Sequence, residues 1–251
     1  MRPEKALGQH FLRDAEVLAD IAAIADVGRS SGVLEIGPGE GALTAFLVGH
    51  GVPVVALDKD PRSLEALHER FGEAVSGHLG DAAIDDLSVL LPGDRSIIVG
   101  NLPYNAASAI QRRVLALGTR ILRSVLMFQR EVAVRLVADA GSRDYGVPSV
   151  MTAVRAQAWL VRDVPPHAFR PPPKVQSAVV LMEARAEPLV GDEDLEAFGA
   201  FVALAFQQRR KTLNNALGDK REALTKAGID PGLRAEQVSP EAFVRLWRAS
   251  L

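Results

Sequence analysis

Four consecutive residues, Asn101-Leu102-Pro103-Tyr104, combine an amide, a rigid proline and an aromatic ring in one short segment. They follow the apolar run 97–100, which is typical of a buried parallel strand. Ligands of open α/β sheets bind at the carboxyl ends of strands, so this segment falls where a ligand would lie. The Asn101 oxygen and nearby backbone carbonyls can accept hydrogen bonds from an exocyclic amine, and the Tyr104 ring can stack on a flat base. The segment therefore predicts a pocket that handles a base bearing an amine.

A glycine-rich loop, Gly37-Pro38-Gly39-Glu40-Gly41, joins a predicted strand over 33–36 to a predicted helix that ends near residue 48. Glycine allows the backbone to approach a ligand closely. The loop lacks the full spacing of a dinucleotide site, and Glu40 would lie poorly beside a pyrophosphate. We therefore expect a nucleoside ligand without phosphates, such as S-adenosylmethionine.

Acidic residues stand where the next two predicted strands end. Asp58 follows strand 54–57 about twenty residues after the glycine loop begins, and an acid there can bind both hydroxyls of a ribose. Asp81 is predicted to end a third short strand, where its carboxylate could accept a hydrogen bond from an adenine amino group. Either residue alone could equally cap a helix or a loop. The two together, beside the glycine loop, favour a nucleoside site.

Strand and helix patterns alternate up to about residue 183, which is typical of βαβ units and a parallel sheet. Further strands are predicted over 97–101, 121–128, 159–164 and 177–183, and helices over 15–25, with Asp14 as N-cap, 61–70 and 131–138. Later helices are predicted over 193–206, 208–217, 220–227 and 240–249, the last with Ser239 as cap and Pro240 in first position. We therefore predict an α/β domain over 1–184, a linker over 185–192 and a small all-helical domain over 193–251.

The composition limits the class of protein. The chain has 251 residues, of which 48% are hydrophobic and only 5% aromatic, so a large core of aliphatic side chains can form. No apolar stretch reaches the length of a membrane span, and the N-terminus lacks the apolar core of a signal peptide. The absence of cysteine excludes disulfides and thiolate metal sites. We expect a cytoplasmic monomer that uses no metal and binds no membrane.

The net charge of −2 argues against a protein that coats nucleic acid through bulk charge. RNA binding would therefore need a local basic patch, and cations gather at two places in the sequence. The candidate RNA-binding residues are Arg209, Arg210, Lys211, Arg170 and Lys174. The first three are adjacent and lack nearby acids, which favours phosphate binding over a merely solvated helix face. Arg112 and Arg113 fit either interpretation equally well.

Five motifs, in this order along the chain, resemble those of the ribosomal RNA adenine N6,N6-dimethyltransferases that act on small-subunit RNA. They are LGQHFL (7–12), EIGPGEG (35–41), NLPYN (101–105), AFRPPPKVQSAVV (168–180) and QRRKTLNNAL (208–217). The resemblance covers about residues 5 to 250. It implies a Rossmann-like methyltransferase domain followed by a helical RNA-binding domain. It also implies S-adenosylmethionine as methyl donor and small-subunit ribosomal RNA, or an assembling 30S particle, as partner.

The resemblance also implies which residues contact the methyl donor. By position they are His10, Leu12, Gly37, Gly39, Asp58, Asp81 and Asn101. Two of them depart from the family pattern. His10 stands where the family often has Asn, and it could instead be a packing or surface residue. Asp58 stands where Glu is usual, and its shorter side chain could hold the ribose less closely or through water.

The predicted reaction is methylation of adenine N6 by a catalytic set of Asn101, Leu102, Pro103, Tyr104 and Phe169. The lone pair of N6 is delocalised into the ring, so the amine is a poor nucleophile. Hydrogen bonds from the amine to the Asn101 side chain and the Leu102 carbonyl would favour a more tetrahedral nitrogen. Tyr104 and Phe169 could stack on an adenine taken out of its helix or loop. Alternatively, Tyr104 packs in the core and Phe169 anchors the proline-rich loop.

Leu102 and the overall function leave alternatives open. A flexible Leu102, where DNA adenine methyltransferases often carry Pro, would leave room for a second methylation. A large-subunit ribosomal RNA dimethylase of the macrolide-resistance type shares the fold and the core motif. A non-catalytic factor for ribosome assembly or transcription is a third possibility, because Asp58 and the sequence Ala106-Ala107-Ser108 depart from the expected pattern. A nicotinamide dehydrogenase is disfavoured by the glycine spacing.

Overall fold

The computed structural model describes residues 9–208 and 210–251, which form two compact units. Unit 1 takes in residues up to Ala133 together with Trp159–Ala184, and unit 2 takes in Val134–Ala158 and Arg185–Leu251. Within the described residues, no helix is long and apolar enough to cross a membrane.

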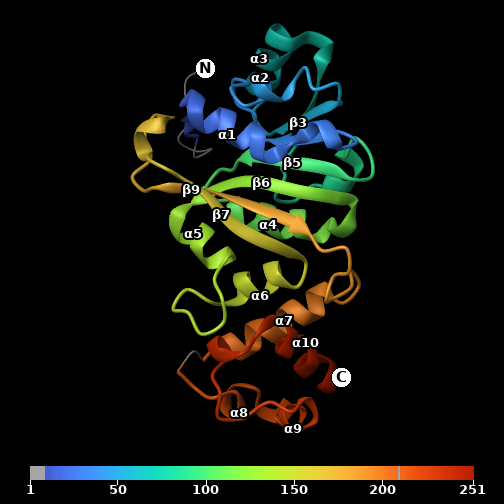
Figure 1. Cartoon of the computed structure of the whole chain (residues 1–251), viewed down its shortest axis with the longest axis vertical. Helices are drawn as coiled ribbons and strands as arrows, with labels where there is room; N and C mark the ends of the chain where they lie inside the picture. The colour runs from blue at the N-terminus through green and yellow to red at the C-terminus, as the bar shows by residue number, and fades with distance from the viewer. Residues whose placement is uncertain (1–8, 209) are drawn as a thin grey trace. The chain divides into compact units, whose positions relative to one another are not determined.

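A central sheet of seven strands organises the α/β part, in the order β4-β3-β2-β5-β6-β9-β7 (Figure 1). The strands β4, β3, β2, β5 and β6 are parallel neighbours, and β9 pairs antiparallel with β6. The strand bounds are β2 (Val33–Ile36), β3 (Val54–Asp58), β4 (Val75–Leu79), β5 (Ser96–Asn101), β6 (Ile121–Gln129), β7 (Ala156–Val164) and β9 (Ser177–Ala184). The predicted α/β class is confirmed. The third strand ends at Leu79, two residues before Asp81.

Strand β5 explains why the site residues that follow it are held firmly. Its residues 96–100 are all buried, as expected of a central parallel strand covered on both faces. Ile97 and Val99 point into the hydrophobic core to which helix α1 (Ala15–Ala25) also contributes, whereas Ile98 points to the opposite face. Burial of each such side chain contributes about 1.5–3 kcal/mol to folding. The carboxyl end of β5 is therefore a rigid base for Asn101.

The helices of the α/β part begin at residues that suit a helix start. Asp14 caps α1 (Ala15–Ala25), and its side chain accepts hydrogen bonds from two backbone N–H groups of the first turn. Asp60 caps α3 (Pro61–Phe71), which has proline in its first position. The sequence predicted both helices. Further helices are α2 (Thr44–Leu47), α4 (Ala107–Ala116) and α5 (Arg130–Leu136).

A short antiparallel pair, β1 (Phe11–Leu12) with β8 (Phe169–Arg170), was not predicted from the sequence. Phe11 lies opposite Arg170 and Leu12 opposite Phe169. Two-residue strands are too short to leave a periodic pattern, which explains why the sequence did not reveal them. The pair brings the N-terminal motif and the proline-rich motif together, although they lie far apart in the chain.

Unit 2 is largely helical and packs around a hydrophobic core that includes several aromatic side chains. Its helices are α6 (Val147–Ala153), α7 (Leu195–Phe206), α8 (Leu213–Ala216), α9 (Glu222–Ala227) and α10 (Pro240–Ala249). Phe198 contacts Trp247 edge to face at a centroid distance of 5.7 Å, and Phe206 stacks on Phe243 at 5.8 Å. Ser239 caps α10, as predicted. The predicted helix over 208–217 is shorter, because the backbone at Thr212 is extended and α8 begins only after it.

Unit 2 has different limits from the helical domain predicted from sequence. It includes α6, which the sequence did not reveal, and residues 185–192, which were expected to be a linker. The buried Arg155 holds that segment, because its guanidinium donates to the Val190 carbonyl at 2.8 Å and pairs with Asp192. In addition, the Arg185 backbone N–H donates to the Arg155 carbonyl at 2.9 Å. Residues 185–192 are therefore tied into unit 2 by hydrogen bonds.

Candidate active site

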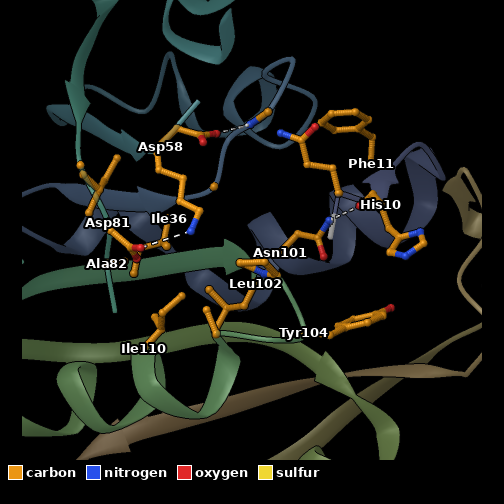
Figure 2. A pocket seen from close by; sticks show the side chains of 18 residues that line it. His10, Phe11, Ile36, Asp58, Asp81, Ala82, Asn101, Leu102, Tyr104 and Ile110 are labelled. Carbon is orange, nitrogen blue, oxygen red and sulfur yellow. Dashed lines mark hydrogen bonds and ion pairs between the residues drawn. The ribbon is translucent and has the colours of Figure 1, made fainter. Parts of the chain in front are cut away.

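A pocket lies in unit 1, where strands β2, β3 and β5 end. Figure 2 shows Asp58 and Asp81 on one side of it, His10 and Tyr104 on the other, and Asn101 and Leu102 between them. Its lining comprises Gln9, His10, Phe11, Ile36, Gly37, Gly39, Leu57, Asp58, Lys59, Gly80, Asp81, Ala82, Asn101, Leu102, Pro103, Tyr104, Ala106 and Ile110. The position is the one expected for a ligand of a doubly wound sheet.

The glycine loop forms the floor of this pocket. Gly37 and Gly39 have φ angles of +69° and +56°, a region that side chains other than glycine rarely adopt. A Cβ atom on Gly39 would lie 2.9 Å from the ring of Phe11, so a larger residue would collide with it. The glycines thus let the backbone border the pocket directly, as the sequence predicted.

Asp58 is held by backbone hydrogen bonds at the end of β3. Its carboxylate accepts from the N–H of Asp60 at 2.9 Å and from the N–H of Gly39 at 3.4 Å. Burial raises the pKa of Asp58, while these N–H groups lower it in part. The carboxylate faces the pocket as an acceptor in a fixed position, which suits recognition of hydroxyl groups.

Asp81 lies in the same pocket, just beyond the end of β4. One carboxylate oxygen accepts from the N–H of Ala83 at 2.9 Å, and the other pairs with Lys59 at 3.2 Å. The Ala83 N–H is the largest influence that lowers the pKa of Asp81, and Lys59 lowers it further. Asp81 is therefore an ionised acceptor close to a cation. Lys59, which the sequence did not single out, also lines the pocket.

The Asn101 side chain has a defined orientation. Its Nδ2 donates a hydrogen bond of 2.8 Å to the backbone carbonyl of His10. Because a carbonyl oxygen can only accept, the NH₂ end must face His10 and the amide oxygen must point the other way. In Figure 2 the Asn101 oxygen, a hydrogen-bond acceptor, lies between Asp58 and Asp81 on one side and Tyr104 on the other. The predicted role of Asn101 as an acceptor for an amine fits this geometry.

Tyr104 and His10 form the aromatic side of the pocket. The Tyr104 hydroxyl and the Ser177 hydroxyl are 2.6 Å apart, and the rings of Tyr104 and His10 stack at a centroid distance of 5.7 Å. His10 Nδ1 donates to the carbonyl of Pro171 at 2.8 Å, since that carbonyl can only accept. Burial raises the pKa of Tyr104. His10 is thus part of the pocket wall, with defined partners.

Three predicted site residues are packed in the protein. Leu12 and Phe169 are each 4% exposed in the hydrophobic core and do not line the main pocket. A stacking role for Phe169 would require its ring to leave the core, and the observed position fits the alternative that it anchors the proline-rich loop. Leu102 lines the pocket, but its side chain is 1% exposed, so it is packed and not the flexible residue that was expected.

The candidate RNA-binding residues lie outside the pocket. Arg170 and Lys174 are exposed in unit 1, and Arg210 and Lys211 are exposed in unit 2. Arg209 falls outside the described residues. Arg112 is exposed, whereas Arg113 donates to the backbone carbonyl of Asp85 and therefore has a structural partner.

Sequence reasoning missed Glu35, which lies under the glycine loop. It is 1% exposed and accepts a hydrogen bond of 2.6 Å from the Thr44 hydroxyl. Burial raises its pKa from 4.5 to about 7, and the nearby charge of Asp58 acts in the same direction. A smaller pocket lined by Glu35, Phe11 and Asn101 adjoins the main one. A glutamate inside an apolar strand was the signal that could have revealed it.

Comparison with known proteins identifies the family. A model described as "Ribosomal RNA adenine dimethylase" matches residues 2–249. The chain belongs to the ribosomal RNA adenine dimethylase family. It is 44% identical to "Ribosomal RNA small subunit methyltransferase A" of Syntrophotalea carbinolica, over 98% of this chain and 96% of that protein. The protein of the same name from Methylococcus capsulatus is 41% identical, over 98% and 97%.

Two solved structures share the fold. The 23S rRNA methyltransferase ErmE is 31% identical with a TM-score of 0.73, covering 95% of this chain and 98% of that chain. A dimethyladenosine transferase from Plasmodium falciparum is 21% identical with a TM-score of 0.79, covering 94% and 96%. The predicted family and the Rossmann-like methyltransferase fold are thus confirmed, and membership in this enzyme family argues against the dehydrogenase alternative.

Proposed function

We propose that this chain transfers methyl groups from S-adenosylmethionine to the N6 atom of adenine in small-subunit ribosomal RNA, twice on each target adenine. The observation that carries the proposal is the fixed Asn101 amide, whose oxygen lies between the two acids and Tyr104 in the pocket that all of them line. The enzyme would act as a cytoplasmic monomer during ribosome assembly and need no metal. Identities of 44% and 41% to small-subunit enzymes, against 31% to a 23S enzyme, favour the small-subunit substrate.

The donor half of the proposed site is formed by the glycine loop and the two acids. Asp58 would bind the ribose hydroxyls, and Asp81 would accept a hydrogen bond from the adenine amino group of the donor. The backbone of Gly37 and Gly39 would lie against the donor, because neither residue carries a Cβ atom. The shorter Asp58 is compatible with this role, because two backbone N–H groups hold its carboxylate at the pocket.

In the proposed transfer, the N6 lone pair attacks the methyl carbon as the bond from that carbon to sulfur breaks. The leaving sulfur retains the bonding pair, and N6 then loses one proton to solvent. The Asn101 oxygen and the Leu102 carbonyl would accept hydrogen bonds from the N6 amino group. These hydrogen bonds favour a tetrahedral nitrogen with its lone pair aimed at the methyl group. Because the sulfonium is reactive, positioning and electrostatics suffice without a strong general base.

Tyr104 would stack on the target adenine, and its position is fixed by the bond to Ser177. A base must leave its stack to reach the end of β5, as in other enzymes that modify bases. The packed Leu102 still lacks the rigid ring of a proline at that position. Its part in a second round of methylation is a separate proposal, which detection of N6-methyladenosine as the only product would refute.

RNA binding is assigned to two basic groups, one in each unit, and to residues 193–251 as an RNA-binding domain. Arg170 at the end of β8 and Lys174 on the loop that follows it are exposed, and Arg210 and Lys211 are exposed before α8. Since the whole chain carries a net charge of −2, such patches would restrict RNA to particular faces. Recognition would then depend on RNA shape, which suits a structured target.

The test uses radiolabelled S-adenosylmethionine with two substrates, small subunits that lack dimethyladenosine and protein-free large-subunit RNA. We expect label in the small subunits, recovered as N6,N6-dimethyladenosine, and little in the large-subunit RNA. The reverse distribution would establish the second candidate, a large-subunit dimethylase, which the likeness to ErmE favours. No label in either substrate, with correctly folded protein, would indicate a non-catalytic factor.

A further inference from the structure

The N-terminal strap is defined here as residues 9–12, of which Gln9, His10 and Phe11 line one wall of the pocket. The strap contacts Asp60 on the side of the two acids and Asn101 on the side of Tyr104. Its pairing with β8 holds one end, through Phe11 opposite Arg170. The ring of Phe11 also lies against Gly39, where it occupies the space that a Cβ atom would need. The strap therefore touches the glycine loop in the same place where the loop borders the pocket.

On the side of the two acids, the strap is tied to Asp60, the N-cap of α3. Gln9 Nε2 donates a hydrogen bond of 3.0 Å to the Asp60 carboxylate, and Asp60 is only 3% exposed. The backbone N–H of Asp60 in turn donates to Asp58 at 2.9 Å. Arg62 also pairs with Asp60, and together with Gln9 it keeps this acid ionised, with a pKa of about 2. Asp60 thus connects the strap to Asp58, the proposed ligand of the ribose hydroxyls.

On the side of Tyr104, the next residue of the strap, His10, fixes the side-chain amide of Asn101. The His10 carbonyl accepts the Asn101 Nδ2 hydrogen bond at 2.8 Å, and the His10 ring lies against Tyr104. His10 is itself held by Pro171. The contacts to Asp60 and to Asn101 come from adjacent residues, so displacement of Gln9 would shift the carbonyl that orients Asn101.

We propose that Gln9 is a positioning residue, which couples methyl-donor binding to the orientation of Asn101 through Asp60 and the His10 backbone. This inference rests on the proposed function, because it assumes that Asp58 binds the methyl donor and that Asn101 accepts a hydrogen bond from N6. Donor bound at Asp58 stabilises the arrangement of Asp58 and Asp60. The strap then stays anchored, and the Asn101 oxygen remains aimed at the target amine. Gln9 therefore influences both donor affinity and the rate of transfer at saturating donor.

The first test is Gln9→Glu, which keeps the size of the side chain, removes the N–H donor and places a second carboxylate beside Asp60. We expect the dissociation constant for S-adenosylmethionine, measured by calorimetry, to rise about tenfold. The single-turnover methylation rate at saturating donor should fall by a similar factor. Gln9→Ala should change both in the same direction but less. Gln157→Glu, the same charge change at an exposed position of β7, should change neither.

The second test exchanges the hydrogen-bond donor and the hydrogen-bond acceptor between positions 9 and 60. In the double variant Gln9→Glu with Asp60→Asn, the Asn amide can donate to the new carboxylate at position 9. That carboxylate also replaces the one that Arg62 loses at Asp60, since Gln9 and Arg62 share the same Asp60 oxygen. Asn remains a good N-cap for α3. We expect this variant to recover most of the affinity and rate that Gln9→Glu loses, because the two changes are coupled. Thermal unfolding of each variant shows whether a loss merely reflects a less stable fold.

Three results would overturn the inference. They are Gln9→Glu with unchanged affinity and rate, Gln9→Glu with weaker binding but an unchanged rate at saturating donor, and failure of the double variant to recover. A wild-type protein that binds no S-adenosylmethionine, or methylates no RNA, would instead overturn the proposed function, and the inference would fall with it. The wild-type measurements therefore distinguish the two failures.

Discussion

The two halves of the pocket are held in place by different kinds of contact. On the donor side, Asp58 and Asp81 accept hydrogen bonds from the backbone two residues further along the chain. On the acceptor side, Asn101 binds the carbonyl of His10, 91 residues away, and Tyr104 pairs with Ser177, 73 residues away. The donor half is thus largely a local structure of strand ends, whereas the acceptor half exists only once distant segments have come together.

This difference predicts separable defects. Changes in the donor half should weaken binding of S-adenosylmethionine, and changes in the acceptor half should slow methyl transfer while the donor still binds. The strap, which contacts both halves, is the exception, because its substitution should affect both quantities.

The largest effect is expected for Asn101→Ala. The change removes the acceptor that orients N6, so the single-turnover rate should fall by about 10²–10³, as for the loss of other preorganised polar groups at reacting centres. The dissociation constant for S-adenosylmethionine should change by no more than a few-fold. Asn105→Ala, at an exposed neighbouring position, serves as the control and should behave like wild type. Turnover of Asn101→Ala near the wild-type rate would refute its role.

The next largest effect is expected for Asp58→Ala, measured by calorimetry. Loss of a charged hydrogen-bond acceptor for the ribose should raise the dissociation constant for S-adenosylmethionine about 10- to 100-fold. At saturating donor the transfer rate should stay within a few-fold of wild type, because the Gln9 hydrogen bond to Asp60 still holds the strap. Asp58→Glu, which restores the residue usual in the family, should bind at least as tightly as wild type. If Asp58→Ala bound donor normally, the donor half would have to be reassigned.

Tyr104 offers a graded test of the acceptor half. Tyr104→Ala removes the stacking surface and should lower kcat/KM for RNA by about 5- to 150-fold. Tyr104→Phe keeps the ring and loses only the hydroxyl contact with Ser177, so its effect should be small. Equal losses in the two variants would show that the hydroxyl, and not stacking, is the important feature.

The last prediction concerns stability and not activity, and it involves the buried Glu35, which lines the smaller pocket. Its pKa in the folded protein, about 7, is above the ordinary value of 4.5, so folding favours the protonated form. The free energy of unfolding should therefore decrease as the pH rises from about 4.5 to 7, by up to about 3 kcal/mol, and then level off. Glu35→Gln should remove this part of the pH dependence. Urea unfolding between pH 5 and 8 measures it, and identical profiles for the two proteins would contradict the assignment.

The same contrast explains what the sequence could reveal. The parallel strands and the ends of β3 and β5 were predictable, because apolar runs and the residues that follow them are local signals. The contact between Asn101 and His10 was not predictable, since it depends on β1 pairing with β8. The motifs placed Asn101, Tyr104 and His10 in one site, but they did not show which contacts hold them.

Other features were missed for related reasons. Phe169 was expected at the pocket, but its register opposite Leu12 places it in the core. The helix α6 is short and follows a stretch rich in glycine and charge, so its pattern was weak. Residues 185–192 have the composition of a linker, yet the buried Arg155 binds them. For Phe169 and for residues 185–192, a distant partner that is invisible in the local sequence decides the structure.

The most direct test measures two quantities on the same preparations of wild type, Asp58→Ala and Asn101→Ala. They are the dissociation constant for S-adenosylmethionine and the single-turnover rate of methylation of small subunits at saturating donor. We expect opposite patterns, with weaker binding and a nearly normal rate for Asp58→Ala, and normal binding and a greatly reduced rate for Asn101→Ala. If both variants lost affinity and rate in equal proportion, the division of the pocket into a donor half and an acceptor half would be wrong.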